Sequence, residues 1–558
     1  MKKMTHRPYL IEPGYESCYE YLLGCYGRIS ADVGDYAAFV NLDCTTMMSK
    51  MFEDVEKLAS FLVAHGIRRG DVLTVFLPTS PHAFIVFYAL SKIGAVADFV
   101  PPFLPPAALK EEREEVGSKG IFILDRMHGS FAGVIGDDLT VICSYSDYAD
   151  GEIRERAKDE ESKISQVSEG ENVIRFLRAL SSAGAPVPTV KDPGRDPAIY
   201  LHGSGTTGKS KTVVLSALAL NNVAYGTYRY KEDLPHTYGN SYSLCILPCF
   251  HSFGISSGIH FCTCNNFSGI IMPKFDAYKA NDYISRYNVQ YISGAPSMFM
   301  KMLDQDNFNN SGVRNLEVLY TGGDIVSESF VEKMNGILES HGSRARLFRG
   351  WGLTEMGGAC TTNYHNNCKP DSIGKCRFGV SIKVIDENGG ILPANENGEL
   401  CVTSDSVMNG YFSTDVPVWN NGVHVDENGT RWVHTGDMGY VDEDGYVFFT
   451  GRKKRIIIIS AYNIYPYSIE QKIMTLPFIN EACAVQGYDE EGKPLVKLCI
   501  SLKPTDMSED EVKENVLRFC EENFESFSVP RKIVIMDALP RTKLAKLDFM
   551  SMSDKAPK

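Results

Sequence analysis

The chain has 558 residues, which is enough for several domains and too long for a peptide-sized binding module. Hydrophobic residues make up 44% of it and charged residues 23%, and these shares exclude global disorder, collagen and coiled coil. The 56 Lys and Arg face 70 Asp and Glu, for a formal net charge of −14. Nucleic acid is therefore not expected as a partner, because its phosphates require a basic face.

The N-terminal segment predicts neither export nor membrane insertion. It carries charge through Arg7, and no continuous apolar run of a secretory signal follows. The longest apolar stretch, residues 83–104, is interrupted by Lys92 and Asp98, which favours a buried helix and strand over an integral membrane segment. The fifteen cysteines show no regular spacing and are expected to be free thiols. We therefore expect a cytoplasmic protein.

Helices and strands alternate near the start of the chain, as in the βαβ units of a parallel sheet. The pattern predicts a helix at 53–66, a strand at 71–77, a helix at 81–94 and a strand at 96–100. A highly charged segment, residues 145–178, interrupts this rhythm and is expected to be a surface excursion without chemistry of its own.

Turn-rich β-like runs follow between residues 382 and 449 and predict a β-rich subdomain. After the basic run 451–455, about a hundred residues remain, enough for a small separate domain. The expected fold class is α/β. A large N-terminal body of mixed α/β subdomains covers residues 1–451, with the β-rich subdomain at about 375–451, and a small α/β C-terminal domain covers 452–558.

The strongest local signal is a glycine-rich loop within residues 200–214. Its glycines allow close approach of backbone to an anion, and its hydroxyls and lysines suit a phosphate group. Taken literally, residues 203–210 also match a P-loop, with Lys209 on the outer phosphates and Ser210 on magnesium. A P-loop opens a helix, whereas the β-branched residues 212–214 favour a strand. The loop alone leaves a P-loop NTPase open as an alternative.

Together with the rest of the chain, the loop resembles the core signature of the adenylate-forming superfamily. This superfamily includes acyl-CoA synthetases, aryl-CoA ligases, luciferases and peptide-synthetase adenylation domains. On this alignment Lys211 is the family lysine, Ser210 stands where proline is usual, and Thr212 stands where glycine is usual. Further segments resemble other family elements in the family's order: residues 247–254, 320–324, 349–355, 434–437, 451–454 and 539–546.

The resemblance implies ATP and Mg²⁺ as partners of the central motifs. Glu355 is the implied metal ligand, Trp351 would stack on adenine, and Asp437 would accept hydrogen bonds from the ribose hydroxyls. The complete implied ATP site comprises Ser204, Gly205, Thr206, Thr207, Gly208, Lys211, Gly323, Asp324, Trp351, Gly352, Thr354, Asp437 and Arg452.

The acid substrate is expected against His251, Phe253 and Gly322, which fall in elements that line the family's acyl pocket. Amino-acid-activating relatives carry a carboxylate in this region to hold the amine. None is visible here, so the resemblance favours a plain carboxylic acid. The residues Phe253, Cys262 and Met298 indicate an apolar lining.

Catalysis is implied for Lys546, with Thr207 and Glu355, in two half-reactions. The acid attacks ATP to give an acyl adenylate and pyrophosphate, and a thiol, usually coenzyme A, then takes the acyl group. Relatives move the C-terminal domain between these steps, which implies a hinge at Lys454 and a thiol-facing segment at Ser460, Ala461 and Tyr462. A carrier-protein phosphopantetheine is the alternative acceptor.

Overall fold

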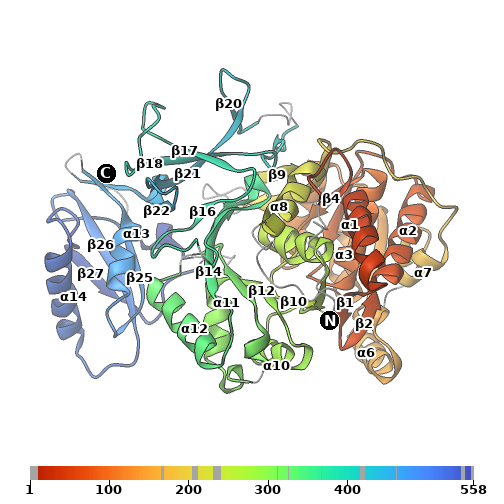
Figure 1. Ribbon diagram of the computed structural model, residues 1–558, viewed down its shortest axis with the longest axis horizontal. Helices are drawn as coiled ribbons and strands as arrows, with labels where there is room; N and C mark the ends of the chain where they lie inside the picture. The colour runs from red at the N-terminus through yellow and green to blue at the C-terminus, as the bar shows by residue number, and fades with distance from the viewer. Residues whose placement is uncertain are drawn as a thin grey trace.

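The computed structural model describes residues 11–164, 167, 169–203, 211–229, 241–310, 312–324, 326–365, 367–414, 421–459, 462–541 and 547–554. These residues form a large N-terminal body and a smaller C-terminal domain, which lies at the left of Figure 1. Both parts mix helices and strands, so the predicted fold class is confirmed.

An eight-stranded sheet in the body contains the predicted βαβ units. Its strand order is β19-β9-β8-β4-β3-β5-β6-β7, and the run from β8 to β7 is parallel. The strands are β3 Val72–Phe76, β4 Val96–Phe99, β5 Gly120–Leu124, β6 Leu139–Cys143, β7 Val173–Arg175, β8 Pro197–Gly203, β9 Lys211–Ser216 and β19 Gly410–Tyr411.

The apolar stretch noted in the sequence is a buried helix and strand. Helix α2 is Met48–Ala64 and helix α3 is Pro81–Ile93. Ser80 caps the N-terminus of α3, where its side chain accepts a hydrogen bond from the N–H of Ala83. Every residue of α3 is buried, as expected of a helix that is hydrophobic all round. No helix in the described part of the chain is both long and apolar enough to cross a bilayer.

The charged segment 145–178 is only in part the surface excursion that its composition predicts. Helix α6, Gly151–Ile164, is exposed, but β7 joins the edge of the eight-stranded sheet, and helix α7, Phe176–Ser181, buries Phe176 completely. The prediction fails at its end because a three-residue strand and a short helix are too brief to show periodicity.

A nine-stranded sheet, with order β16-β15-β14-β13-β12-β10-β11-β1-β2, forms the other half of the body. Strands β1 and β10 to β14 run parallel along it, and β2, β15 and β16 pair antiparallel at its ends. The strands are β1 Ala37–Asn41, β2 Cys44–Met47, β10 Ser241–Cys245, β11 Phe267–Ile271, β12 Tyr291–Gly294, β13 Val318–Thr321, β14 Leu347–Leu353, β15 Gly358–Thr362 and β16 Lys375–Cys376.

Helices cover both sheets of the body and bury its largest core clusters. Near the site, α8 is Ala217–Arg229 and a π-helical segment, η2, is Gly254–His260. The remaining long helices are α1 Cys18–Val33, α4 Pro106–Val116, α5 Asp125–Ile135, α10 Ala277–Tyr287, α11 Pro296–Leu303 and α12 Glu328–Ser340. All fifteen cysteines are free thiols, as predicted.

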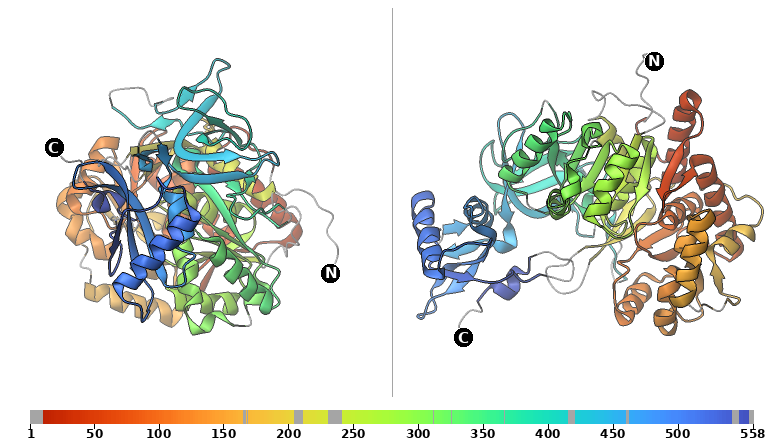
Figure 2. Two further views of the ribbon diagram at one scale, coloured as in Figure 1. Left: turned by 90° about the vertical axis from the view of Figure 1, so that its left-hand side faces the viewer. Right: turned by 90° about the horizontal axis from the view of Figure 1, so that it is seen from below.

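The predicted β-rich subdomain is an antiparallel sheet of β17 Ser381–Ile385, β18 Gly398–Thr403, β20 His424–Val425, β21 Arg431–Val441 and β22 Val447–Arg452. The C-terminal domain follows with its own hydrophobic core, and Figure 2 shows it to one side of the body. It contains β23 Ile457–Ile459, β24 Tyr462–Ile464, α13 Pro466–Ile473, β25 Ile479–Tyr488, β26 Pro494–Leu502, α14 Glu509–Asn523, β27 Lys532–Ile535 and α15 Phe549–Met552. The exact boundary at residue 452 stays a prediction.

Candidate active site

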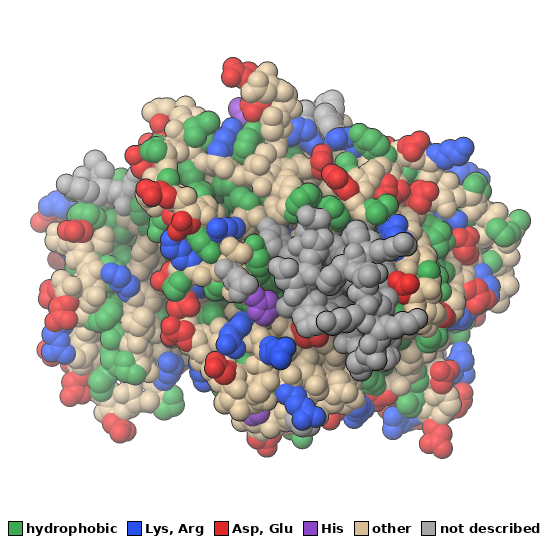
Figure 3. All heavy atoms as spheres, in the orientation of Figure 1, with side chains coloured by type: hydrophobic (Ala, Val, Ile, Leu, Met, Phe, Trp, Pro, Cys, Tyr) green, Lys and Arg blue, Asp and Glu red, His purple; other side chains and the backbone are tan. Residues whose placement is uncertain are grey.

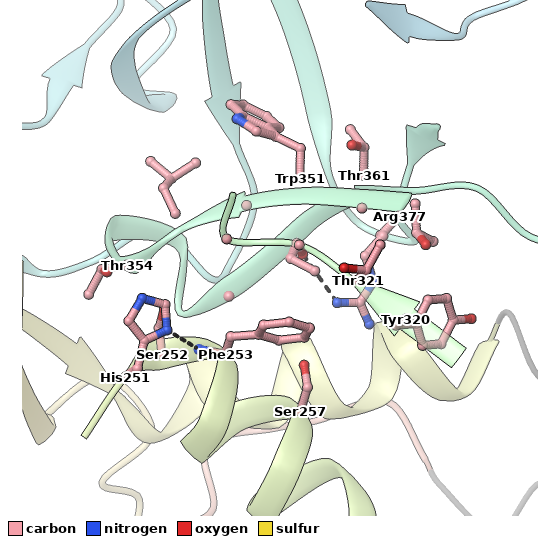
Figure 4. A pocket seen from close by; sticks show the side chains of 18 of the residues that line it. His251, Ser252, Phe253, Ser257, Tyr320, Thr321, Trp351, Thr354, Thr361 and Arg377 are labelled. Atoms are coloured by element: carbon pink, nitrogen blue, oxygen red, sulfur yellow. Dashed lines mark hydrogen bonds between the residues drawn. The ribbon is translucent and has the colours of Figure 1, made fainter. Parts of the chain in front are cut away.

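A cavity of about 210 Å³ lies where the ends of β13 and β14 meet β15 and η2. Much of its wall is backbone, because glycines predominate along β14 and after β13. Of the residues predicted from the sequence, the cavity brings together His251, Phe253, Gly322, Gly323, Trp351, Gly352, Thr354, Glu355 and Arg452. In Figure 4, Trp351 stands on one side of the strand, and Phe253 and Ser257 lie on the other.

The glycine pair after β13 is required by the local geometry. A Cβ on Gly322 would lie 3.0 Å from the carbonyl oxygen of Gly350 and 4.0 Å from the ring of Phe253. Gly323 has φ +82°, a conformation that side-chain-bearing residues rarely adopt. The pair therefore lets the chain turn directly against β14 without a side chain between them.

His251 lies at the rim of the cavity with an exposed side chain. Its Nδ1 accepts a hydrogen bond from the N–H of Phe253 at 3.2 Å (Figure 4). The side chain of His251 is therefore not packed in the core, and its place at the mouth of an acyl pocket stays a prediction.

Asp437 does not itself line the cavity but is held by two side chains that do, those of Trp351 and Arg452. Trp351 donates from Nε1 to Asp437 Oδ2 at 2.7 Å, and Arg452 Nε lies 2.7 Å from Oδ1. Asp437 on β21 pairs directly with Arg452 on β22, and only 2% of it is exposed. The antiparallel register of β21 and β22 thus brings together Asp437 and Arg452 from two separate motifs, and Trp351 reaches them from a third, on β14.

Glu355 has a partner that the sequence did not indicate. The hydroxyl of Tyr411 donates to Glu355 Oε1 at 2.8 Å, and Lys211 Nζ lies 4.3 Å from the centre of the Tyr411 ring. Burial and the neighbouring carboxylate raise the pKa of Tyr411, so its proton stays on the hydroxyl. Pairing of β19 with β9 brings Tyr411 here.

The glycine-rich loop connects two antiparallel strands. Gly203 at the end of β8 is opposite Lys211 at the start of β9, and Gly203 lines the cavity. A P-loop leads into a helix, whereas β9 is a strand, so the P-loop NTPase interpretation is wrong. The predicted phosphate ligands Ser204, Gly205, Thr206, Thr207 and Gly208 lie outside the described residues.

The other predicted residues are not brought to the cavity or cannot be placed. Asp324 is exposed in the bend after β13 and does not line the cavity, and Lys454 lies in a turn of 3₁₀ helix, η6 Lys453–Arg455. The backbone of Tyr462 belongs to β24. Ser460, Ala461 and Lys546 lie outside the described residues.

A buried ionic cluster lies directly before the loop, and the sequence did not indicate it. His202 Nε2 is 2.7 Å from Asp98 Oδ1, and Nδ1 is 3.2 Å from Glu112 Oε2. Thr74 also donates its hydroxyl to Asp98, which is completely buried. Burial by itself lowers the pKa of His202, but the two carboxylates outweigh it and raise that pKa to about 10. His202 is therefore a cation at neutral pH.

The lining of the acyl side is more polar than the sequence suggested. Phe253 lines it as expected, but Cys262 and Met298 do not; Met298 packs against the core of the nine-stranded sheet. Polar side chains from four elements or loops stand there instead: Thr227, Ser257, Tyr320, Thr321 and Arg377. Thr361 also lines the cavity, but on the side of Trp351, with which it pairs across β14 and β15 (Figure 4). No local motif marks the four segments, because α8, η2, β13 and the segment after β16 meet only through packing.

The two-sheet body, the glycine-walled cavity and the small C-terminal domain together define an adenylate-forming enzyme. The AMP-binding enzyme model matches residues 29–412, and the AMP-binding enzyme C-terminal domain model matches residues 468–546. The chain belongs to the AMP-binding enzyme family.

Curated relatives include CoA ligases of two kinds. A 4-coumarate–CoA ligase of Pinus taeda is 25% identical over 94% of this chain and 92% of its own length. A long-chain-fatty-acid–CoA ligase of Bacillus subtilis is 26% identical over 88% and 87%.

Solved structures share the fold at lower identity. The anthranilate CoA ligase AuaEII with anthranoyl-AMP matches with TM-score 0.78 at 18% identity, covering 97% of each chain. ATP-bound MatB of Rhodopseudomonas palustris matches with TM-score 0.77 at 20% identity, covering 94% of this chain and 97% of its own.

Proposed function

We propose that the protein is an AMP-forming ligase that joins a carboxylic acid to coenzyme A through an acyl adenylate. The observation that carries this proposal is the division of the cavity by β14, with Trp351 and Asp437 on one side and Phe253 on the other. The curated CoA ligases among the relatives support the same reaction. The free thiols suit a reducing cytoplasm, where we place the reaction.

On the nucleotide side, Asp437 would accept hydrogen bonds from the ribose hydroxyls while Arg452 and the Trp351 N–H hold its carboxylate in place. The indole ring offers a flat face to adenine. The triphosphate would be held by Ser204, Gly205, Thr206, Thr207, Gly208, Lys211 and Thr354. Charge that builds up on phosphate oxygens during transfer is then met by donors and cations already in place.

Mg²⁺ fits the acidic end of this cavity. Glu355 presents a carboxylate there, and the Tyr411 hydroxyl fixes one of its oxygens. Hard oxygen ligands of this kind are those that Mg²⁺ prefers. When bound, the ion would neutralise charge on the phosphate oxygens.

On the acyl side, the acid would lie between His251, Phe253 and Gly322, and its carboxylate would attack the α-phosphorus of ATP and release pyrophosphate. Lys546 would bridge the carboxylate and the α-phosphate. Rotation of residues 452–558 about Lys454 would then exchange Lys546 for the segment Ser460, Ala461 and Tyr462, which admits the thiol.

The products of ATP cleavage test this proposal. The purified protein is incubated with ATP, Mg²⁺ and a panel of carboxylic acids, with and without CoA, and nucleotides are separated by chromatography. We expect AMP and pyrophosphate only when a suitable acid is present, and a thioester only when CoA is added. ADP and phosphate, or hydrolysis that ignores the acid, would overturn the proposal. Adenylate formation without thioester would point to a carrier-protein acceptor.

A further inference from the structure

A buried arginine stands in the wall of the acyl side of the cavity. Arg377 follows β16, is only 5% exposed and lines the cavity together with Tyr320 and Thr321. In Figure 4 these three residues lie toward one end of the cavity, whereas His251 and Thr354 lie toward the other. The cavity therefore extends from the predicted phosphate-contacting end to a guanidinium.

Two backbone carbonyls hold the guanidinium of Arg377. Its Nη1 donates to the carbonyl of Ala359 at 3.2 Å, and Nη2 donates to the carbonyl of Val223 at 3.0 Å. A Cβ on Gly226, within α8, would lie 3.9 Å from Nη2, so the helix passes close to the arginine. These carbonyl contacts orient the planar cation, and an oriented cation loses little entropy when it binds an anion.

A second donor faces the same space. The hydroxyl oxygen Oγ1 of Thr321 is buried in the cavity wall and has no hydrogen-bond partner within the described ranges. A buried hydroxyl of this kind is normally satisfied by a partner. Because Thr321 directly precedes Gly322, a ligand in the acyl pocket would reach it.

Two tyrosine rings near Arg377 also line the cavity. The rings of Tyr291 and Tyr320 meet edge to face with centroids 5.9 Å apart, and both line the cavity. Burial raises the pKa of Tyr320 to about 12, and the positive charge of Arg377 opposes part of that rise. Arg377 thus acts electrostatically on the surface that the substrate would contact.

We infer that the acid is a dicarboxylic acid with an apolar spacer, and that Arg377 binds its second carboxylate with the help of Thr321. This inference rests on the proposed function and names its substrate class. A neutral tail would cover the cation without replacing its lost solvation, whereas a carboxylate matches the planar guanidinium with two parallel hydrogen bonds. Arg377 therefore sets specificity rather than chemistry.

Matched acids test the inference directly. Adipic, suberic, isophthalic and terephthalic acids are each compared with their monomethyl esters, which keep the shape and one free carboxyl but lose the second charge. Acid-dependent pyrophosphate release is measured as kcat/KM. We expect at least one diacid to exceed its monoester by about 10- to 150-fold, the factor that hydrogen bonds to a charged group supply.

Variants separate charge from structure. Arg377→Gln keeps an amide donor for the carbonyls but removes the cation, so kcat/KM should fall about 10- to 150-fold for the diacid and stay within about threefold for the monoester. Arg377→Lys should retain part of the preference. Arg113→Gln is the control for loss of a buried arginine, because Arg113 is also 5% exposed and donates to the carbonyls of Val134 and Ile135, and to Asp138 at 2.6 Å, but does not line the cavity.

Two outcomes would overturn the inference: pyrophosphate release that favours monoesters over diacids in the wild type, or an equal loss for both substrates in Arg377→Gln with thermal unfolding unchanged. If no acid at all supports pyrophosphate release, the proposed function fails instead. Activity with neutral acids but not with diacids leaves the proposed function standing and removes only the role of Arg377.

Discussion

Asp437 shows how one side chain can join two motifs. The resemblance implies a ribose ligand at Asp437 and an adenine-stacking ring at Trp351, and the structure links the two through the indole N–H. A phenylalanine ring would leave that carboxylate oxygen without this donor. Since Arg452 lies on the other oxygen, the carboxylate is held in one orientation before any nucleotide arrives.

Replacement of this carboxylate should weaken nucleotide binding. We expect Asp437→Ala to reduce ATP affinity by about 1.5 to 3 kcal/mol, because charge-assisted hydrogen bonds to the ribose are lost. Isothermal titration with ATP measures the change. Asp426→Ala is the control, since Asp426 also accepts from a tryptophan, Trp432 Nε1 at 2.9 Å, but Trp432 does not line the cavity, whereas Trp351 does. An unchanged affinity in Asp437→Ala would remove it from the site.

At the scale of elements, strand β8 places the buried, positively charged side chain of His202 directly before the glycine-rich loop. His202 precedes Gly203, and it is clamped by Asp98 from β4 and by Glu112 from α4. Neighbouring parallel strands place these groups together, although the sequence separates them widely. The pair therefore ties the loop's first strand to the centre of the sheet.

This cluster makes stability depend on pH. Folding raises the pKa of His202 from 6.5 to about 10, so its stabilising effect is complete below about pH 6.5 and is lost as the pH rises to about 10. In His202→Gln this contribution is absent, and the alkaline decline in unfolding free energy should be shallower by up to about 1.4 kcal/mol per pH unit. Urea unfolding across this range measures it.

His341→Gln provides the comparison for this measurement. His341 ends α12, where its Nδ1 lies 2.9 Å from the carbonyl of Ile337. Its replacement should leave the alkaline slope as in the wild type. Parallel slopes for the wild type and His202→Gln would show that the buried cluster does not hold the proton through this range.

At the scale of the whole molecule, the C-terminal domain has its own core and a limited contact with the β-rich sheet. Tyr467 on α13 packs edge to face on Phe449 of β22, with ring centroids 4.9 Å apart. The polypeptide passes from β22 into this domain through η6, which contains the predicted hinge Lys454. Figure 3 shows acidic and basic side chains interspersed on the face in view, and no continuous basic surface for nucleic acid stands out there.

The two half-reactions should respond differently to loss of the C-terminal lysine. We expect Lys546→Ala to suppress acid-dependent pyrophosphate exchange by about 100-fold or more, because a preplaced cation at the α-phosphate is lost. ATP binding and thioester formation from preformed acyl adenylate should stay largely intact. Lys532→Ala is the control in the same domain, since Lys532 pairs with Asp554 at 3.1 Å. Equal loss in both half-reactions would contradict the assigned role.

Motifs whose chemistry depends on nearby residues could be predicted from the sequence. Three features depend only on neighbours within a few positions: the glycine pair at 322–323, the strands on either side of the glycine-rich loop, and the acidic Glu355. The structure brings Gly322, Gly323, Gly203 and Glu355 to one cavity. The βαβ start and the β-rich subdomain were likewise predictable, because hydrophobic period and turn residues act over short distances.

Sequence motifs were therefore sufficient to predict the family, which the family models confirm, whereas the roles of the nucleotide-site residues stay predictions. Contacts between distant segments became evident only from the folded structure: Tyr411 donates to Glu355, and Asp98 lies against His202. Packing also places Arg377 in a cavity wall that the sequence predicts to be apolar. Burial and ion pairing depend on which surfaces pack together, and residues from α8, η2 and β13 meet Arg377 without any shared spacing along the chain.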